Sequence, residues 1–347
     1  MSGNSLEGRC NDLHKREARS IKEAVVWANH GFNSRRYDVY GNKLRVLLSL
    51  ITQDNDYQQE QAAIAQQTAD RLGISLQPLF ADNDAIKQST QILNAIQNNG
   101  ERPDAILVEP ASRTGYPKAA QAAIAAGTAW VLLNSEAEYL KDLRRAASVP
   151  AFSVSADNRQ IGRIQGEQLA ALLPRGGCVL YVQGPTSSSV VEQRTAGMLE
   201  TKPAAVSIKT LKSVDWTEDG GCHAVLSWLR LSTARSEPIS AVQAQNDFLA
   251  LGARRALEQE TSGPKREKRG RLPLLGVDGL AKTGQAWVRQ GSLTATIVVP
   301  PTTEPALEAL VRAIRTGIQP AESALVAPHS FPEAKDLALK RMMEVGS

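Results

Sequence analysis

The sequence predicts an α/β protein made of two similar lobes, each built on a doubly wound parallel sheet. Its 347 residues suffice for two ordinary domains, and a hydrophobic content of 42% argues against a disordered chain. From Lys43 onward, short runs rich in β-branched residues or leucine alternate with longer stretches of helical period. This alternation is typical of consecutive βα units, which build parallel sheets.

The first series of βα units extends from residue 44 to residue 133. Gly73 and Gly127 stand where the left-handed ends of two helices favour glycine. We expect strands at 44–51, 74–80, 105–108 and 129–133, and helices at 57–72, 84–99 and 116–126.

A second series follows the link at 146–150, and the sequence Pro-Arg-Gly-Gly at 174–177 marks a turn within it. We expect strands at 151–155, 178–183, 206–212, 241–245, 274–277 and 294–299, helices at 158–173, 190–199, 219–231, 247–260, 282–290 and 304–316, and a last extended piece at 324–329. The two halves therefore repeat the same βα order.

The net charge of +4 does not indicate a nucleic-acid-binding surface. Residues 1–43 contribute +3 and residues 261–273 contribute +4, so the remainder of the chain carries −3. We expect the segment 261–273 to be a solvated charged loop, and no nucleic-acid partner.

Metal, cofactor and enzyme chemistry find no support in the motifs. Cys10, Cys178 and Cys222 form no CxxC pair, and the four histidines never fall at metal-ligand spacing. Sequences of the GxxxxGK[ST], GxGxxG, GxSxG and HExxH types are absent from the positions where they would carry function. We therefore expect no metal, no cofactor and no catalytic residues.

Neither a membrane span nor an export signal is predicted. No run approaches the roughly 20 apolar residues of a transmembrane helix. The longest apolar stretch near the start, at 24–28, is shorter than the roughly 7–15 residues of a signal-peptide core. From the residues alone, the expected compartment is the cytoplasm.

Five motifs stand in one order along the chain. They are SADN at 155–158, RTAGM at 194–198, AQNDFLALGA at 244–253, LGVDG at 275–279 and LTATI at 293–297. Together they resemble the type I periplasmic binding protein family, which includes ribose-binding-protein-like sugar receptors and shares its fold with the effector domains of Lac-type repressors. The resemblance covers about residues 44–330.

The resemblance implies a ligand cleft and a three-stranded hinge. The side chains that it places in the cleft are Asn55, Tyr57, Asn134, Ser135, Arg194, Trp216, Asn246 and Asp278. Each fits a sugar site, because carboxylate and guanidinium groups make charge-assisted bonds to hydroxyls and aromatic faces cover the C–H side of a ring. Each also has a structural alternative: Asp278 as a turn residue, Trp216 as core, and Asn246 or Asp247 as helix caps.

Three residues depart from the pattern of this family. Its sugar binders often carry Asp-Arg where this chain has Asn134-Ser135, and a polar glutamine near Val299. Fewer directional bonds favour an inositol-like, methylated or deoxygenated sugar, or a non-sugar signal molecule, over a ribose-like ligand.

The implied organisation is an N-terminal extension at 1–43, an N-terminal lobe at 44–155 plus 300–326, a C-terminal lobe at 156–299 plus 327–335, and a tail at 336–347. The implied function is binding of a small polar ligand, expected to be a carbohydrate, and its delivery to an ABC transporter permease or a membrane sensor. Such receptors act as monomers in the periplasm. The alternative is the ligand-sensing domain of a Lac-repressor-type regulator, which would need a helix-turn-helix ahead of the first strand.

Overall fold

The computed structural model describes residues 43–345 except 99, 187, 232–237 and 260–270, with side chains as far as Leu339. Almost all of the N-terminal extension expected at 1–43 and most of the charged loop expected at 261–273 lie outside these residues. None of the helices in the described ranges is long and apolar enough to span a membrane.

The described chain divides into two compact units. Unit 1 comprises the residues up to Asp54, Gln58–Ser155 and Thr302–Ala324, and unit 2 comprises Asn55–Tyr57, Ala156–Pro301 and the residues from Leu325 onward. Apart from the short segment Asn55–Tyr57, the chain therefore passes from one unit to the other at 155–156, at 301–302 and at 324–325.

Unit 1 contains a six-stranded sheet in the order β11-β5-β4-β3-β1-β2. Its strands are β1 (Arg45–Leu50), β2 (Ser75–Phe80), β3 (Ala105–Val108), β4 (Ala129–Leu133), β5 (Ala151–Ala156) and β11 (Ser323–Val326). The pairs β1–β2, β1–β3, β3–β4 and β4–β5 are parallel, as the βα alternation predicts. The helices are α3 (Asp56–Leu72), α4 (Ala85–Gln97), α5 (Pro117–Ala125), α6 (Tyr139–Ala146) and α13 (Thr303–Thr316).

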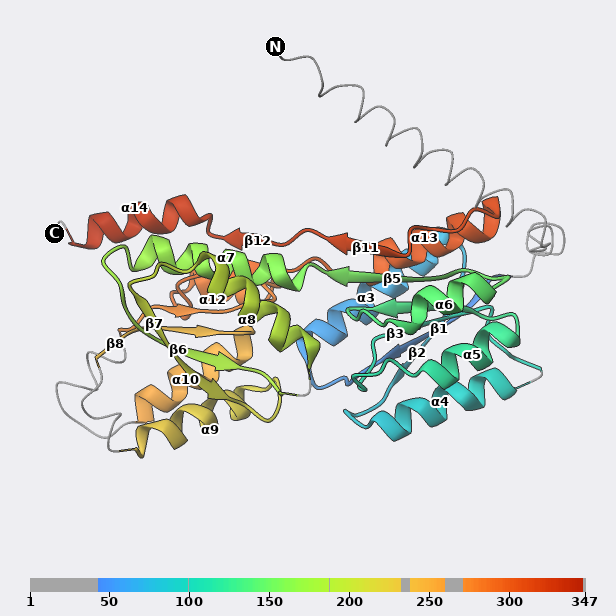
Figure 1. Ribbon diagram of the computed structural model, residues 1–347, viewed down its shortest axis with the longest axis horizontal. Coiled ribbons are helices and arrows are strands. Elements are labelled where there is room, and N and C mark those ends of the chain that lie inside the picture. Colours follow the sequence, from blue (N-terminus) through green and yellow to red (C-terminus); the bar gives the residue numbers. More distant parts are fainter. Residues whose placement is uncertain (1–42, 99, 187, 232–237, 260–270, 346–347) are drawn as a thin grey trace, which may run out of the picture. The chain divides into compact units, whose positions relative to one another are not determined.

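Continuous apolar runs in the strands of unit 1 reflect burial on both faces of the sheet. Alternate residues such as Ile106, Trp130 and Leu132 pack with α4, α5 and α6 in one cluster. The intervening residues Leu107 and Val131 are equally buried. Figure 1 shows α4 and α5 on the opposite side of this sheet from α13.

Unit 2 contains a four-stranded parallel sheet in the order β7-β6-β8-β9. The strands are β6 (Gly177–Gln183), β7 (Val206–Lys212), β8 (Ile239–Ala244) and β9 (Leu274–Leu275). Strand β10 (Thr296–Val298) continues it through parallel bridges from Leu275 to Ala295 and from Asp278 to Val298, and pairs antiparallel with β12 (His329–Phe331). The helices are α7 (Asn158–Leu172), α8 (Ser189–Thr201), α9 (Glu218–Leu229), α10 (Asp247–Gln259), α12 (Gly284–Arg289) and α14 (Ala334–Val345).

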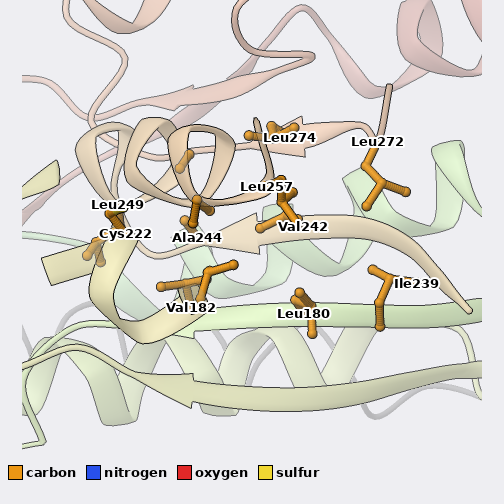
Figure 2. Close-up of a cluster of buried hydrophobic side chains, with 14 of the residues drawn as sticks. Leu180, Val182, Cys222, Ile239, Val242, Ala244, Leu249, Leu257, Leu272 and Leu274 are labelled. Carbon is orange, nitrogen blue, oxygen red and sulfur yellow. The ribbon is translucent and has the colours of Figure 1, made fainter. Parts of the chain in front are cut away.

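The two faces of the unit 2 sheet are covered by different helices. Leu180 and Val182 of β6 face α9 and α10, whereas Val179 and Tyr181 face α7 and α8. Figure 1 shows these helix pairs on opposite sides of the sheet, and Figure 2 shows Val242 and Leu274 among the side chains of the first cluster. Both units therefore have the doubly wound parallel arrangement that the sequence predicts.

Two helical stretches escaped the sequence prediction. Helix α6 occupies residues for which no element was expected, just before the link at 146–150, and residues 336–347, expected as a tail, begin inside α14. Both stretches are rich in charged residues, and each is fixed by a few apolar contacts. Leu140 and Leu143 of α6 join the cluster of unit 1. Leu337 of α14 is 1% exposed and belongs to the cluster that also contains Leu169 and Leu172 of α7. Tertiary burial, rather than local propensity, stabilises these helices.

Helices α7 and α8 approach each other closely because glycines line their contact. A Cβ atom at Gly197 would lie 2.0 Å from the carbonyl oxygen of Arg159, and one at Gly162 would lie 2.1 Å from the carbonyl oxygen of Arg194. Arg194 therefore projects from a helix whose position is set by backbone-to-backbone packing.

Gly197→Ala is expected to lower the free energy of unfolding by about 1–3 kcal/mol or more, because the added methyl group forces α7 and α8 apart. Urea denaturation followed by circular dichroism measures the effect. Leu199→Ala is the matched control on the same helix, since Leu199 is 53% exposed. Equal stability of the two variants would contradict the close packing.

Gln61 of α3 anchors the start of α13, directly after the passage at 301–302. Its Oε1 accepts hydrogen bonds from the backbone N–H groups of Thr302 and Thr303 at 2.9 and 3.2 Å, and its Nε2 donates to Thr302 Oγ1 at 2.8 Å. All three residues are fully buried. The side chain thus satisfies two backbone donors that a helix N-terminus leaves without partners.

Gln61→Ala is expected to cost about 2–4 kcal/mol of unfolding free energy, since two buried N–H groups lose their acceptor. Gln67→Ala, an exposed position of the same helix, is the control and should change stability little. Thermal unfolding of the three proteins measures the difference, and a Gln61→Ala loss no larger than that of the control would show that the anchor is unimportant.

Candidate functional site

Half of the predicted site residues lie at the carboxyl ends of the parallel strands of unit 2. Trp216 follows β7, Asn246 follows β8, Asp278 follows β9, and Arg194 projects from α8, the helix after β6. In open parallel sheets, ligands bind at this edge. Asn55 and Tyr57 also belong to unit 2, whereas Asn134 and Ser135 follow β4 in unit 1.

Arg194 is buried and held in one orientation. Its Nε donates to Asn158 Oδ1 at 3.0 Å, and its Nη1 donates to the carbonyl oxygen of Gln245. Burial lowers the pKa of the guanidinium, while the nearby carboxylate of Asp278 acts in the opposite sense. An arginine side chain stays charged under these conditions, so a positive charge is fixed at this edge of the sheet.

Trp216 lies against the guanidinium and against a glycine. The Cζ atom of Arg194 is 6.0 Å from the centre of the indole ring, within the range of a cation–π contact. A Cβ atom at Gly184, in the loop after β6, would lie 2.4 Å from ring atom Cη2. The ring is half-buried, so Trp216 is neither a core residue nor a fully exposed one.

Asn246 is 2% exposed and uses both ends of its amide within the protein. Its Oδ1 accepts from the N–H of Leu249 at 2.7 Å, which caps α10, and its Nδ2 donates to the carbonyl oxygen of Trp216 at 2.9 Å. Asn246 is therefore a helix cap, as the structural alternative predicted. It also fixes the backbone at Trp216.

Asp278 occupies a left-handed turn. Its φ is +103° and that of Gly279 is +56°. The side chain is partly exposed, and the described part of the chain donates no hydrogen bond to its carboxylate. Burial raises the pKa of this carboxyl from 3.8 to about 7, and the charge of Arg194 opposes that rise. The group is thus a hydrogen-bond acceptor available to a ligand.

Two residues of the sequence motif at 244–253 have roles that the motif alone did not assign. Gln245 is fully buried, accepts from the N–H of Gly184 at 3.1 Å and donates to Tyr181 Oη at 2.8 Å. Asp247 is 2% exposed and accepts from the N–H of Gly279 at 2.8 Å. Asn158, from the SADN motif, was likewise expected only as part of a pattern, and it orients Arg194.

The remaining predicted residues are positioned by their own loops. Asn55 Oδ1 accepts from the N–H of Tyr57 at 2.9 Å, and Tyr57 packs on a buried apolar cluster that includes Val299. Asn134 adopts a φ of +49°, and its N–H donates to the carbonyl oxygen of Val154 at 3.0 Å. Ser135, next to it, is half-buried.

Metal chemistry gains no support from the side chains. In the part of the chain that the structure describes, no three His, Cys, Asp or Glu residues gather closely enough to hold an ion.

Comparison with known proteins gives both a family and structural neighbours. Residues 46–315 match the model of the periplasmic binding protein domain. The chain is 26% identical over 263 residues to a ribose import binding protein from Bacillus subtilis, covering 75% of this chain and 78% of that protein.

Two solved structures share the fold. A periplasmic solute binding protein of an ABC transporter from Actinobacillus succinogenes, with bound D-allose, has a TM-score of 0.72 and 24% identity over 85% of this chain and all of that one. A myo-inositol binding protein from Caulobacter has a TM-score of 0.70 and 20% identity over 86% of this chain and 96% of that one.

The family model spans well over half of the chain, and the arrangement of strands and helices is that of the solved neighbours. The chain therefore belongs to the periplasmic binding protein family, whose members bind solutes and are not enzymes.

Proposed function

We propose that this protein is a carbohydrate receptor that closes on a small polar ligand and delivers it to an ABC importer in the periplasm. The relative from Bacillus subtilis is named for ribose import, and one structural neighbour is the solute binding protein of an ABC transporter. A membrane sensor is the other partner that a receptor of this kind can serve. These names and the chemistry of the site support the proposed ligand class, partner and compartment.

The observation that carries the proposal is the combination of one available carboxylate, one buried guanidinium and one half-exposed indole at the same sheet edge. Asp278 can accept two hydroxyl hydrogens, and the N–H groups of Arg194 that do not bind Asn158 or Gln245 can donate to a ring or hydroxyl oxygen. The face of Trp216 suits the C–H side of a sugar ring. Such a set binds hydroxylated rings and offers no nucleophile–base pair for catalysis.

The protein offers fewer strong polar groups to a ligand than the ribose-like sugar binders of this family often do. Asn134 and Ser135 carry no charge, and Val299 is 2% exposed within an apolar cluster. A methylated or deoxygenated sugar presents fewer hydroxyls and matches an edge with one carboxylate better than a fully hydroxylated pentose does, and an inositol is kept as a further candidate.

The three passages between the units are proposed to act as the hinge. Pro300 and Pro301 precede the passage at 301–302, and their fixed φ angles make this segment stiff. Ligand binding would shift the equilibrium between open and closed forms, and the partner would recognise the closed form.

A first experiment records the melting temperature of the protein against pentoses, hexoses, inositols and their methylated and deoxygenated derivatives. A ligand that binds only the folded state raises this temperature. Asp278→Asn is expected to weaken binding of the responding sugar about tenfold or more, because the carboxylate loses charge-assisted acceptance of hydroxyl hydrogens.

Asp142→Asn serves as the control for that substitution, since the side chain of Asp142 is 79% exposed on α6 of unit 1. The control should bind as tightly as the wild type. An unchanged melting temperature with every sugar of the panel would contradict the carbohydrate proposal.

Ligand affinity is also expected to depend on pH through Asp278. The ionised carboxylate accepts hydroxyl hydrogens, and its pKa is about 7, so affinity should be full above this pH and fall about tenfold per unit below it. Isothermal titration calorimetry between pH 5 and pH 8 measures the profile, because this range extends about one pH unit or more on either side of the pKa of Asp278. Asp278→Asn should flatten it.

The empty protein should show the opposite trend, because the pKa of Asp278 is higher in the folded than in the unfolded chain. The unfolded carboxyl loses its proton near 3.8 while the folded one keeps it to about 7, so the contribution to stability declines as pH rises through this window. Equal pH slopes of unfolding free energy for the wild type and Asp278→Asn would rule out the raised pKa.

A further inference from the structure

The carboxylate of Asp247 is enclosed at the N-terminus of α10. Its Oδ2 accepts from the N–H of Gly279 at 2.8 Å, and its Oδ1 accepts from Thr296 Oγ1 of β10 at 2.6 Å. Only 2% of the residue is exposed. One buried side chain thus connects a helix, a neighbouring strand and the turn that contains Asp278.

Backbone surrounds this carboxylate closely. A Cβ atom at Gly276 would lie 2.1 Å from Asp247 Oδ1, and one at Gly284 would lie 2.0 Å from Oδ2. Both glycines flank the turn in sequence. The loop from 276 to 284 is therefore folded around the carboxylate, and a longer acidic side chain would not fit.

The turn needs such support because its geometry is costly. Asp278 has a φ of +103°, a region that residues with a side chain rarely adopt. Its backbone is held by bonds from Asp278 N–H to the carbonyl oxygen of Ile297 and from Val299 N–H to the carbonyl oxygen of Asp278, each 3.0 Å long. The bond from Gly279 to Asp247 fixes the next peptide, and so the direction in which the Asp278 side chain leaves the backbone.

The carboxyl groups of Asp247 and Asp278 influence each other electrostatically. Burial and then repulsion from Asp278 raise the pKa of Asp247 well above its usual range, and Arg194 acts in the opposite sense. A second carboxyl group beside an acceptor for hydroxyls is an expensive choice for a plain helix cap, which Asn246 already supplies.

We infer that Asp247 is a positioning residue for ligand binding, which fixes the left-handed turn at 278–279 and thereby aims the carboxylate of Asp278 at the ligand without touching the ligand itself. This inference rests on the proposed function, in which Asp278 accepts hydroxyl hydrogens from a carbohydrate. It predicts that Asp247 influences affinity through Asp278 and through no other group.

A double-mutant cycle tests this dependence on the full-length protein. Calorimetric titration with D-allose and with myo-inositol is carried out on the wild type, Asp247→Ala, Asp278→Asn and the double variant. We expect Asp247→Ala to weaken binding about tenfold in the wild-type background and to have almost no effect when Asp278 is already Asn. Additive losses would overturn the inference.

Two further variants separate positioning from simple loss of stability. Asp247→Asn keeps an acceptor for Gly279 N–H and an amide that can donate to Thr296, so its affinity should stay within about threefold of the wild type. Val225→Ala removes buried apolar volume from the core of the same unit, and it should lower stability while leaving affinity unchanged. Equal loss of affinity in Asp247→Ala and Val225→Ala would also overturn the inference.

Hydrogen exchange tests the positioning without any ligand. The peptide covering 276–284 should exchange faster in Asp247→Ala than in the wild type or in Asp278→Asn. Unchanged exchange would refute the inference even if no sugar binds. Failure of the wild type to bind any sugar, together with faster exchange in Asp247→Ala, would instead refute the proposed function alone.

Discussion

The residues at the N-terminus of α10 fix the loops that follow β6, β7 and β9 of unit 2, and the candidate site depends on them. Gln245 binds the amide of Gly184 after β6, Asn246 binds the carbonyl of Trp216 after β7, and Asp247 binds the amide of Gly279 after β9. Consecutive residues at a strand-to-helix junction point in different directions, so three short side chains can reach three loops. The side chains of the candidate site are thus positioned by buried polar groups behind them.

The residues that orient Arg194 and Trp216 are different from the side chains that are available to a ligand. Asn158 and the carbonyl of Gln245 orient Arg194 before any ligand arrives, and Gly184 gives Trp216 its place. Groups that are already oriented lose less conformational entropy when they bind. The cost is the burial of several polar side chains, which a folded protein tolerates because each of them has hydrogen-bond partners. Affinity for a small ligand then depends on a few exposed atoms.

The motif at 244–253 pointed to the sheet edge that carries the candidate site, and the glycine, turn and strand patterns were enough to predict the parallel sheets. The motif did not reveal that Asn246 spends both ends of its amide inside the protein, nor that Asp247 reaches Gly279, 32 residues further along the chain. Helix α6 was missed for a related reason, since Leu140 and Leu143 are buried in a cluster that extends to residues as far away in sequence as Leu47 and Ile92.

The sequence by itself determined the alternation of strands and helices, the two α/β units and the family, because these follow from local periodicity and from short runs of neighbouring residues. It also named Arg194, Trp216 and Asp278 as site candidates. Only the tertiary structure decided how the turn at Asp278 is held and that burial raises the pKa of its carboxyl to about 7. The hydrogen bonds that hold the turn and the burial that shifts the pKa come from residues distant in sequence, which no local pattern records.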